Sequence, residues 1–210
     1  MLWITFGKKD FIVSEIVYQK LYYPKSRKKL LAVLKKSVSP KRYQHLLGVE
    51  QAALRLAELN QVDLEKASIA ALVHDYAKER SAADFRSVIT KSNLDPDLLN
   101  WNNVIWHGVV GAQMIKDELG IQDEEILDAV RKHTVGAPQM TLLDKIIYVA
   151  DFIEEGRVFP DAQLARTIAY ADLDSAVAFE TKHTLQYLMS ANKVIYPAAI
   201  LTYNKWVVEN

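Results

Sequence analysis

Cysteine is absent from this 210-residue sequence. The fold therefore contains no disulfide, and any metal ion has to be held by His, Asp or Glu side chains. Also missing is an uncharged apolar run of the roughly 18–20 residues needed to cross a bilayer. The apolar start, Met1–Phe6, is too short for the core of a signal peptide. We therefore expect a cytoplasmic protein without a membrane partner.

The sequence also has no excess of charge of one sign, since 26 Lys and Arg balance 26 Asp and Glu. This balance argues against a nucleic-acid partner. The exception is the segment Met1–Arg42, where eleven basic residues face only two acids, Asp10 and Glu15. Such a segment is usually the solvated face of a helix, but it can also attract an anionic substrate or a nucleic acid.

Strand-like alternation is missing as well, because apolar residues recur almost everywhere at helical spacing. Half of the residues are hydrophobic, which allows a sizeable core. We expect an all-α fold with a basic helical extension over residues 1–38 and a main domain over residues 39–210. The predicted helices cover residues 11–23, 27–38, 40–60, 63–79, 81–92, 108–119, 123–135, 141–155, 162–171, 173–191 and 197–208.

Two of the five histidines lie on predicted buried helix faces. His45 shares its face with apolar residues at steps of three and four, and His74 shares its face with alanines. Asp75 follows His74 directly, and a buried carboxylate is costly unless it is paired. A cation between these side chains would remove that cost. The alternatives are a satisfied core histidine and a simple His–Asp hydrogen bond at the end of a helix.

Other polar residues occupy positions of the same kind. Asp151 lies in the otherwise apolar run Ile146–Ile153, although a solvent-facing stripe with Asp144 is also possible. His107 precedes a predicted helix start. His133 lies at a predicted helix C-terminus, where the dipole favours a protonated imidazole that suits phosphate binding or general-acid chemistry.

Three cations lie at spacings that could direct them toward the same place. Arg42 is three residues before His45, and Lys78 is three residues after Asp75, so each shares a helix face with its neighbour. Arg157 follows the helix breaker Gly156. These side chains could bind phosphate groups, or each could be an ordinary surface cation.

Six ordered sequence blocks over residues 39–206 resemble the HD-domain superfamily of metal-dependent phosphohydrolases. Within it they are similar to the YqeK-type symmetrical diadenosine tetraphosphatases. The blocks are Arg42-Tyr43-Gln44-His45, His74-Asp75-Tyr76-Ala77-Lys78, Trp106-His107-Gly108, Lys132-His133-Thr134-Val135-Gly136, Met140 to Asp151, and Leu201-Thr202-Tyr203-Asn204.

The resemblance implies one or two transition-metal ions, usually iron, with manganese or zinc as other ions that suit such ligands. It implies His45, His74, Asp75 and Asp151 as metal ligands, and His107 and His133 as residues that face a second metal or the phosphates. Asp75, Lys78, His107 and His133 are the expected catalytic residues. The substrate contacts expected besides these are Arg42, Thr134, Arg157, Val194, Ile195, Tyr196, Pro197, Ala198 and Ala199.

The implied reaction is hydrolysis of diadenosine tetraphosphate and related dinucleoside polyphosphates with release of ADP, and a homodimer is a plausible assembly. Two other functions stay open from the sequence. One is cleavage of a different nucleotide by another enzyme of the superfamily. The other is a non-catalytic protein that binds nucleotides or RNA, for which the basic segment before residue 39 is the main support.

Overall fold

The computed structural model describes residues 16–209, and in this range every regular element is a helix. None of these helices is long and apolar enough to pass through a membrane. The all-α fold expected from the sequence is confirmed. The elements are α1 (Arg27–Ser37), α2 (Pro40–Leu59), α3 (Leu64–Val73), α4 (Ala82–Lys91), the 3-10 turn η1 (Pro96–Asn100), α5 (Asn103–Val109), α6 (Gly111–Leu119), α7 (Glu124–Lys132), α8 (Leu142–Ile153), α9 (Pro160–Ala169), α10 (Leu173–Ser190), α11 (Pro197–Tyr203) and the π-helical turn η2 (Asn204–Val208).

Side-chain caps set the starting points of α2 and α8, the helices that contain His45 and Asp151. Ser39 accepts a hydrogen bond from the Arg42 amide, and Pro40 occupies the first turn of α2. Thr141 forms a capping box with Asp144 at the start of α8. The sequence signals for these starts are local, and both helices begin where they were predicted.

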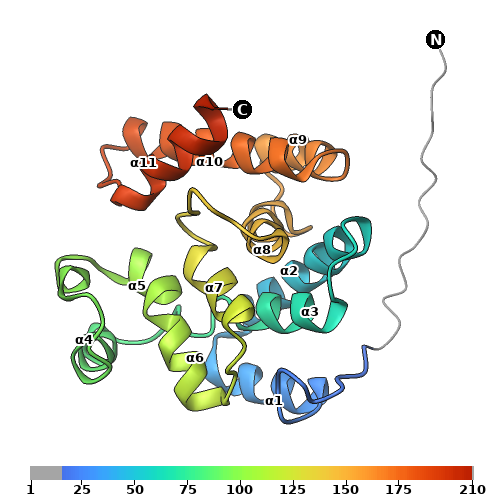
Figure 1. The fold of residues 1–210 in the computed structure, drawn as a ribbon, viewed down its shortest axis with the longest axis vertical. Helices are drawn as coiled ribbons and strands as arrows, with labels where there is room; N and C mark the ends of the chain where they lie inside the picture. Colours follow the sequence, from blue (N-terminus) through green and yellow to red (C-terminus); the bar gives the residue numbers. More distant parts are fainter. Residues whose placement is uncertain (1–15, 210) are drawn as a thin grey trace.

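The largest core cluster packs α2, α3, α7 and α8 together, and Figure 1 shows α8 end-on near the middle of the molecule. Leu56 of α2, Leu72 of α3 and Ile147 of α8 are fully buried in it. Each side chain of this size contributes roughly 1.5–3 kcal/mol when it leaves water. This cluster fixes the relative positions of the helix ends that carry the polar residues.

Two smaller clusters complete the core. Phe85 and Trp106 join α4 to α5 and α6. Ile105, Val135, Leu185 and Ala199 form the other cluster, which joins α5 and the loop after α7 to α10 and α11. The C-terminal helices therefore pack on the loop that follows His133.

The helix predicted over residues 11–23 is wrong in its described part, because residues 16–23 are not helical. Residues 11–15 lie outside the described range. The Tyr18 hydroxyl bonds to Ser68 at 2.8 Å, and the Gln19 amide donates to Glu65 at 2.7 Å. These contacts with α3 outweigh the local helical pattern, and Lys20 adopts a left-handed φ of 63°.

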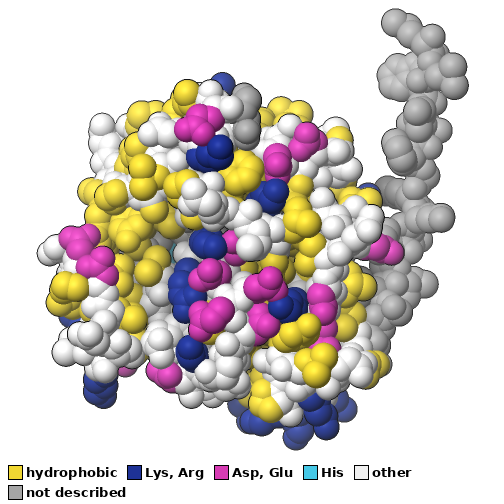
Figure 2. Space-filling model, in the orientation of Figure 1, with side chains coloured by type: hydrophobic (Ala, Val, Ile, Leu, Met, Phe, Trp, Pro, Cys, Tyr) yellow, Lys and Arg dark blue, Asp and Glu magenta, His cyan; other side chains and the backbone are white. Residues whose placement is uncertain are grey.

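Helix α1 turns its apolar side to the main core, where Leu30 and Leu34 are fully buried. Its lysines point outward, and Figure 2 shows Lys and Arg side chains gathered at the lower edge of this face, where Figure 1 places α1. The basic residues of α1 thus form the solvated side of an amphipathic helix. Residues 1–38 as a separate extension stay a prediction.

Candidate functional site

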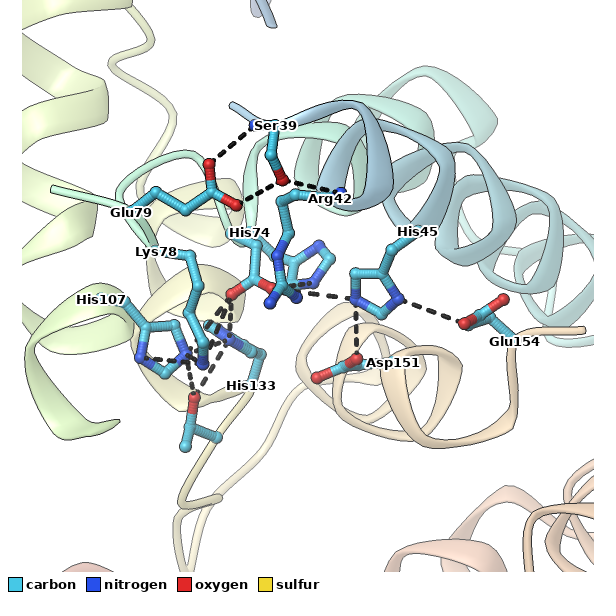
Figure 3. A network of polar contacts seen from close by, with 12 residues as sticks. Ser39, Arg42, His45, His74, Lys78, Glu79, His107, His133, Asp151 and Glu154 are labelled. Atoms are coloured by element: carbon cyan, nitrogen blue, oxygen red, sulfur yellow. Dashed lines mark hydrogen bonds and ion pairs between the residues drawn. The ribbon is translucent and has the colours of Figure 1, made fainter. Parts of the chain in front are cut away.

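One polar cluster brings together side chains from five helices or helix ends. His45 comes from the middle of α2, His74 and Asp75 follow α3, His107 is in α5, His133 follows α7, and Asp151 is near the end of α8. Figure 3 shows the converging side chains of His45, His74, His107, His133 and Asp151. The sequence placed His107 before a helix, but it lies inside α5, because Asn102 caps this helix earlier than predicted.

The helix predicted over residues 63–79 ends at Val73, so the His74–Asp75 pair lies in a series of tight turns instead. The Tyr76 amide donates to Val73 at 2.9 Å, and the Lys78 amide donates to Asp75 at 3.0 Å. Each bond spans three residues rather than four. Because the chain winds more tightly here, His74 and Asp75 are not spaced as they would be in an α-helix. The sequence pattern did not indicate these turns.

Asp75 is the centre of the cluster, and its two carboxylate oxygens face different groups. Oδ2 lies 3.6 Å from Nε2 of His74 and 3.8 Å from Nε2 of His45. Oδ1 lies 3.4 Å from Nε2 of His107 and 3.7 Å from Nε2 of His133. One carboxylate therefore joins two pairs of imidazoles.

All four of these imidazoles turn Nε2 toward the cluster because Nδ1 has an oxygen partner behind the ring. Hydrogen bonding of Nδ1 to an oxygen assigns the proton to Nδ1 and leaves the Nε2 lone pair free, which is the arrangement of metal-binding histidines. The partners are the Ala71 carbonyl for His74 at 2.7 Å, the Asn103 carbonyl for His107 at 2.7 Å, the Val130 carbonyl for His133 at 2.6 Å and the Glu154 carboxylate for His45 at 3.2 Å.

Several buried atoms of the cluster have no hydrogen-bond partner among residues 16–209: Nε2 of His45, Nε2 of His74 and Oδ1 of Asp75. Unpaired buried polar atoms are costly, and a cation between them would satisfy them. The His45–His74–Asp151 group and the His74–Asp75–His133 group each bring their ligand atoms within 4.8 Å of one another. The cluster can therefore hold a metal ion, and its all-nitrogen and oxygen donors suit first-row transition metals.

The protonation of the cluster fits this use. Burial lowers the pKa of His74 to about 4 and that of His107 to about 3, so both are neutral near pH 7. Burial alone would raise the pKa of Asp75, but the facing imidazoles and the Lys78 ammonium hold it well below its ordinary range. His74 and His107 therefore have the neutral form that metal binding requires, beside an ionised carboxylate. Burial alone would lower the pKa of His45, but its contacts with Asp151 and Glu154 raise it.

The three predicted phosphate-binding cations each lie on this cluster. Arg42 donates to Oδ2 of Asp75 at 2.5 Å, and Arg157 donates to Oδ1 of Asp151 at 2.8 Å. Lys78 lies 2.9 Å from Nε2 of His107. Their side chains keep 27%, 39% and 31% of their surface exposed, so they border the site rather than fill it.

Thr134 also belongs to the cluster, since its Oγ1 lies 2.9 Å from Nε2 of His107 and 3.0 Å from Nε2 of His133. Residues 194–199, which were expected to contact substrate, form the loop before α11 and the start of this helix. Tyr196 packs edge-to-face on Trp101 with ring centroids 4.7 Å apart, in the third core cluster with Val135. Contact of residues 194–199 with substrate stays a prediction. His183 lies apart from the cluster, paired with Asp161 at 3.1 Å.

Two acidic residues were missed by the sequence reasoning. Glu154 binds His45, and the only local signal is its position three residues after Asp151, on the same side of the helix end. Glu180 of α10 is buried, and its Oε2 has no hydrogen-bond partner in the described part of the chain. Half of the residues of α10 are polar, so an acid among them gives no sequence signal of burial.

The buried carboxyl of Glu180 should make the protein less stable as the pH rises. Burial and the charge of Asp151 raise the pKa of Glu180 well above 4.5, so the folded protein keeps a proton that the unfolded chain loses. Stability therefore falls above about pH 4.5 by up to about 1.4 kcal/mol per pH unit, until the pH reaches the folded pKa. Glu180→Gln removes this titration.

We expect the gain in unfolding free energy of Glu180→Gln over the wild type to grow between about pH 5 and pH 8. Urea denaturation across this range, at equal metal loading, measures it. The exposed neighbour Lys182→Gln is the control, and its difference from the wild type should not follow the same curve. A gain for Glu180→Gln that stays constant with pH would contradict a protonated Glu180.

The polar cluster lies in the part of the chain that a known family model matches. The HD domain family matches residues 42–156, which make up more than half of the chain and contain every member of the cluster. The chain belongs to the HD-domain family. The paired His74 and Asp75 lie within the matched range, in the turn after α3.

Two curated relatives show which members of the HD-domain family this chain resembles. A protein of Bacillus subtilis named symmetrical bis(5'-nucleosyl)-tetraphosphatase is 44% identical over 87% of this chain and 98% of its own length. A protein of the same name from Halalkalibacterium halodurans is 40% identical over 88% of this chain and 98% of its own length. The resemblance to symmetrical tetraphosphatases seen in the sequence is confirmed.

A solved structure matches the HD fold over nearly the same range. It is an HD superfamily hydrolase from Clostridium acetobutylicum, described as involved in NAD metabolism. It is 34% identical, with a TM-score of 0.82 over 87% of this chain and 97% of its own. The agreement confirms the helical HD architecture.

Proposed function

We propose that this protein is a metal-dependent hydrolase that cleaves diadenosine tetraphosphate and related dinucleoside polyphosphates symmetrically to two ADP. The observation that carries the proposal is the Asp75 carboxylate, which joins two groups of imidazoles and is bordered by three cations. The relatives named as symmetrical tetraphosphatases support the substrate class.

We further propose iron as the resident metal, with manganese or zinc as the alternatives. His45, His74, Asp75 and Asp151 would hold it, and His107 and His133 would face a second ion or the phosphates. When bound, the metal supplies a water of lowered pKa and neutralises charge on the phosphoryl oxygens. The donor set fits these ions because it is made of imidazole nitrogens and carboxylate oxygens.

The chain's own cations provide the phosphate contacts in this proposal. A tetraphosphate chain carries about four negative charges. Arg42, Lys78 and Arg157 border the cluster, where they contact Asp75, His107 and Asp151 respectively. Arg157 can leave Asp151 for a phosphate because it is on the exposed loop after α8. Fixed positive charge around the central phosphates would favour the transition state electrostatically.

His107, His133 and Thr134 lie together on the Oδ1 side of Asp75, and we propose that they contact phosphate oxygens. The attacking water oxygen forms a bond to one of the two inner phosphorus atoms. The bond from that phosphorus to the central bridging oxygen breaks, and this oxygen leaves with the other ADP. A cut at the centre of a symmetrical substrate accounts for two identical products.

Product analysis tests the reaction. Protein purified anaerobically with its metal content measured should convert diadenosine tetraphosphate to ADP alone, as followed by anion-exchange chromatography. In water enriched in ¹⁸O, one of the two ADP molecules should gain a single ¹⁸O atom on its β-phosphate. Formation of ATP plus AMP would contradict cleavage at the centre of the tetraphosphate. A lack of cleavage by metal-loaded protein would contradict the proposed hydrolase activity.

The homodimer and the cytoplasmic location expected from the sequence stay predictions. Light scattering of the purified protein would test the first, and fractionation of cells would test the second.

A further inference from the structure

The imidazole of His45 is anchored differently from the other three of the cluster. His74, His107 and His133 bond through Nδ1 to a backbone carbonyl three or four residues earlier in their own chain segment. His45 instead bonds through Nδ1 to the side chain of Glu154, 109 residues away. Its ring position therefore depends on a contact between two helices.

Helix α8 supplies both contacts of the His45 ring. Asp151 lies 3.1 Å from Nε2, and Glu154, three residues later, lies 3.2 Å from Nδ1 (Figure 3). The end of α8 thus holds the ring from both nitrogens. If Glu154 were absent, the only carboxylates facing the ring would be Asp151 and Asp75, both on the Nε2 side. They would draw the proton to Nε2, where it would block metal binding.

The Glu154 carboxylate itself lies in a space left by two glycines. It is buried, with 7% of the residue exposed, and the Gly156 amide donates to its Oε2 at 2.6 Å. A Cβ atom on Gly48, three residues after His45 on α2, would come within 2.5 Å of the same oxygen. A Cβ atom on Gly156 would come within 2.9 Å of both carboxylate oxygens.

We propose that Glu154 is a positioning residue that fixes the proton and orientation of His45 for metal binding, and that Gly48 exists to leave room for its carboxylate. The inference rests on the proposed metal function of His45. Glu154 acts through His45 rather than on the substrate. A carboxylate behind a metal-binding imidazole typically strengthens metal binding by roughly 10–100-fold.

Titration of the metal-free protein with Mn²⁺, followed by calorimetry, tests the role of Glu154. Glu154→Ala should raise the Kd for Mn²⁺ by about 10–100-fold. Glu154→Gln should raise it by only about threefold, because its amide oxygen still accepts a hydrogen bond from Nδ1. The exposed neighbour Glu155→Ala is the matched control and should bind as the wild type does.

Gly48→Ala tests the same role without touching Glu154 or His45. The new methyl group should push the carboxylate off His45 and raise the Kd for Mn²⁺ by roughly tenfold. Helix α2 should stay intact, because alanine favours a helix more than glycine does. ¹⁵N spectra of the imidazoles should show the His45 proton leaving Nδ1 in both Gly48→Ala and Glu154→Ala.

The possible results separate this inference from the proposed function. Wild-type protein that binds Mn²⁺, with Glu154→Ala or Gly48→Ala binding within about twofold of it, would overturn the inference alone. Equal losses in Glu154→Gln and Glu154→Ala would also overturn it, because a hydrogen-bond acceptor would then be irrelevant. Wild-type protein that binds no Mn²⁺ would overturn both.

Discussion

Asp75→Asn is expected to abolish metal binding and lower the rate of diadenosine tetraphosphate hydrolysis by about a thousandfold or more. The Asp75 carboxylate faces four imidazoles and one guanidinium, and it is 2% exposed. The Asn side chain keeps its volume but has no charge, and its amide nitrogen cannot act as a ligand. Metal analysis and initial rates, measured on one preparation, would show both losses together.

The control for this variant is Asp117→Asn, which makes the same chemical change on an exposed residue of α6. It should keep wild-type metal content and activity. Circular dichroism of Asp75→Asn should show unchanged helicity, since the apolar cores do not depend on this carboxylate. Hydrolysis by Asp75→Asn at a rate within tenfold of the wild type would refute the central role given to Asp75.

The predictable part of this fold is the part that local patterns determine. Helices α2 and α8 begin at Ser39 and Thr141, where a capping hydroxyl precedes an apolar repeat. The apolar repeat also indicates which side is buried, so it placed His45 toward the core before its partners were known. For Asp151 the repeat left a solvent-facing position possible. Their meeting point then followed from the resemblance to HD domains.

The parts that could not be predicted depend on contacts between distant segments. The segment 16–23 has a helical pattern, but Tyr18 reaches Ser68 of α3 and straightens it. The turn at His74 and Asp75 replaces a predicted helix, because these side chains meet groups from α2, α5 and α7. Glu154 was missed since its partner His45 is on a helix that precedes it by more than a hundred residues.

A buried ion pair also joins the N-terminal part of the described chain to α2. Its contribution to the free energy of unfolding can be measured. Arg27 of α1 donates through Nε to Oε1 of Glu50 at 2.7 Å and through its terminal nitrogen to Oε2 at 2.5 Å. Glu50 is 2% exposed and also accepts from Ser68, which bonds to Tyr18. The network therefore joins residues 18 and 27 to α2 and α3.

Arg27→Ala is expected to lower the free energy of unfolding by about 3 kcal/mol, because it leaves the Glu50 carboxylate buried without its counter-charge. We take the lower end of the range for broken buried pairs, since the Arg27 side chain is 25% exposed. For a chain of this size the melting temperature should fall by roughly 10 °C. Denaturation in urea and thermal scans would measure both changes.

Two further variants show whether the lost charge pairing is the cause. Lys28→Ala, on the exposed side of α1, should change stability by less than about 0.5 kcal/mol. Arg27→Ala combined with Glu50→Gln should be more stable than Arg27→Ala alone, because no unpaired charge then stays buried. If Arg27→Ala and Lys28→Ala were equally stable, the basic segment would be a separable extension, as the sequence suggested. A loss of about 3 kcal/mol would instead show that the chain from residue 18 onward is part of the folded unit that contains the polar cluster.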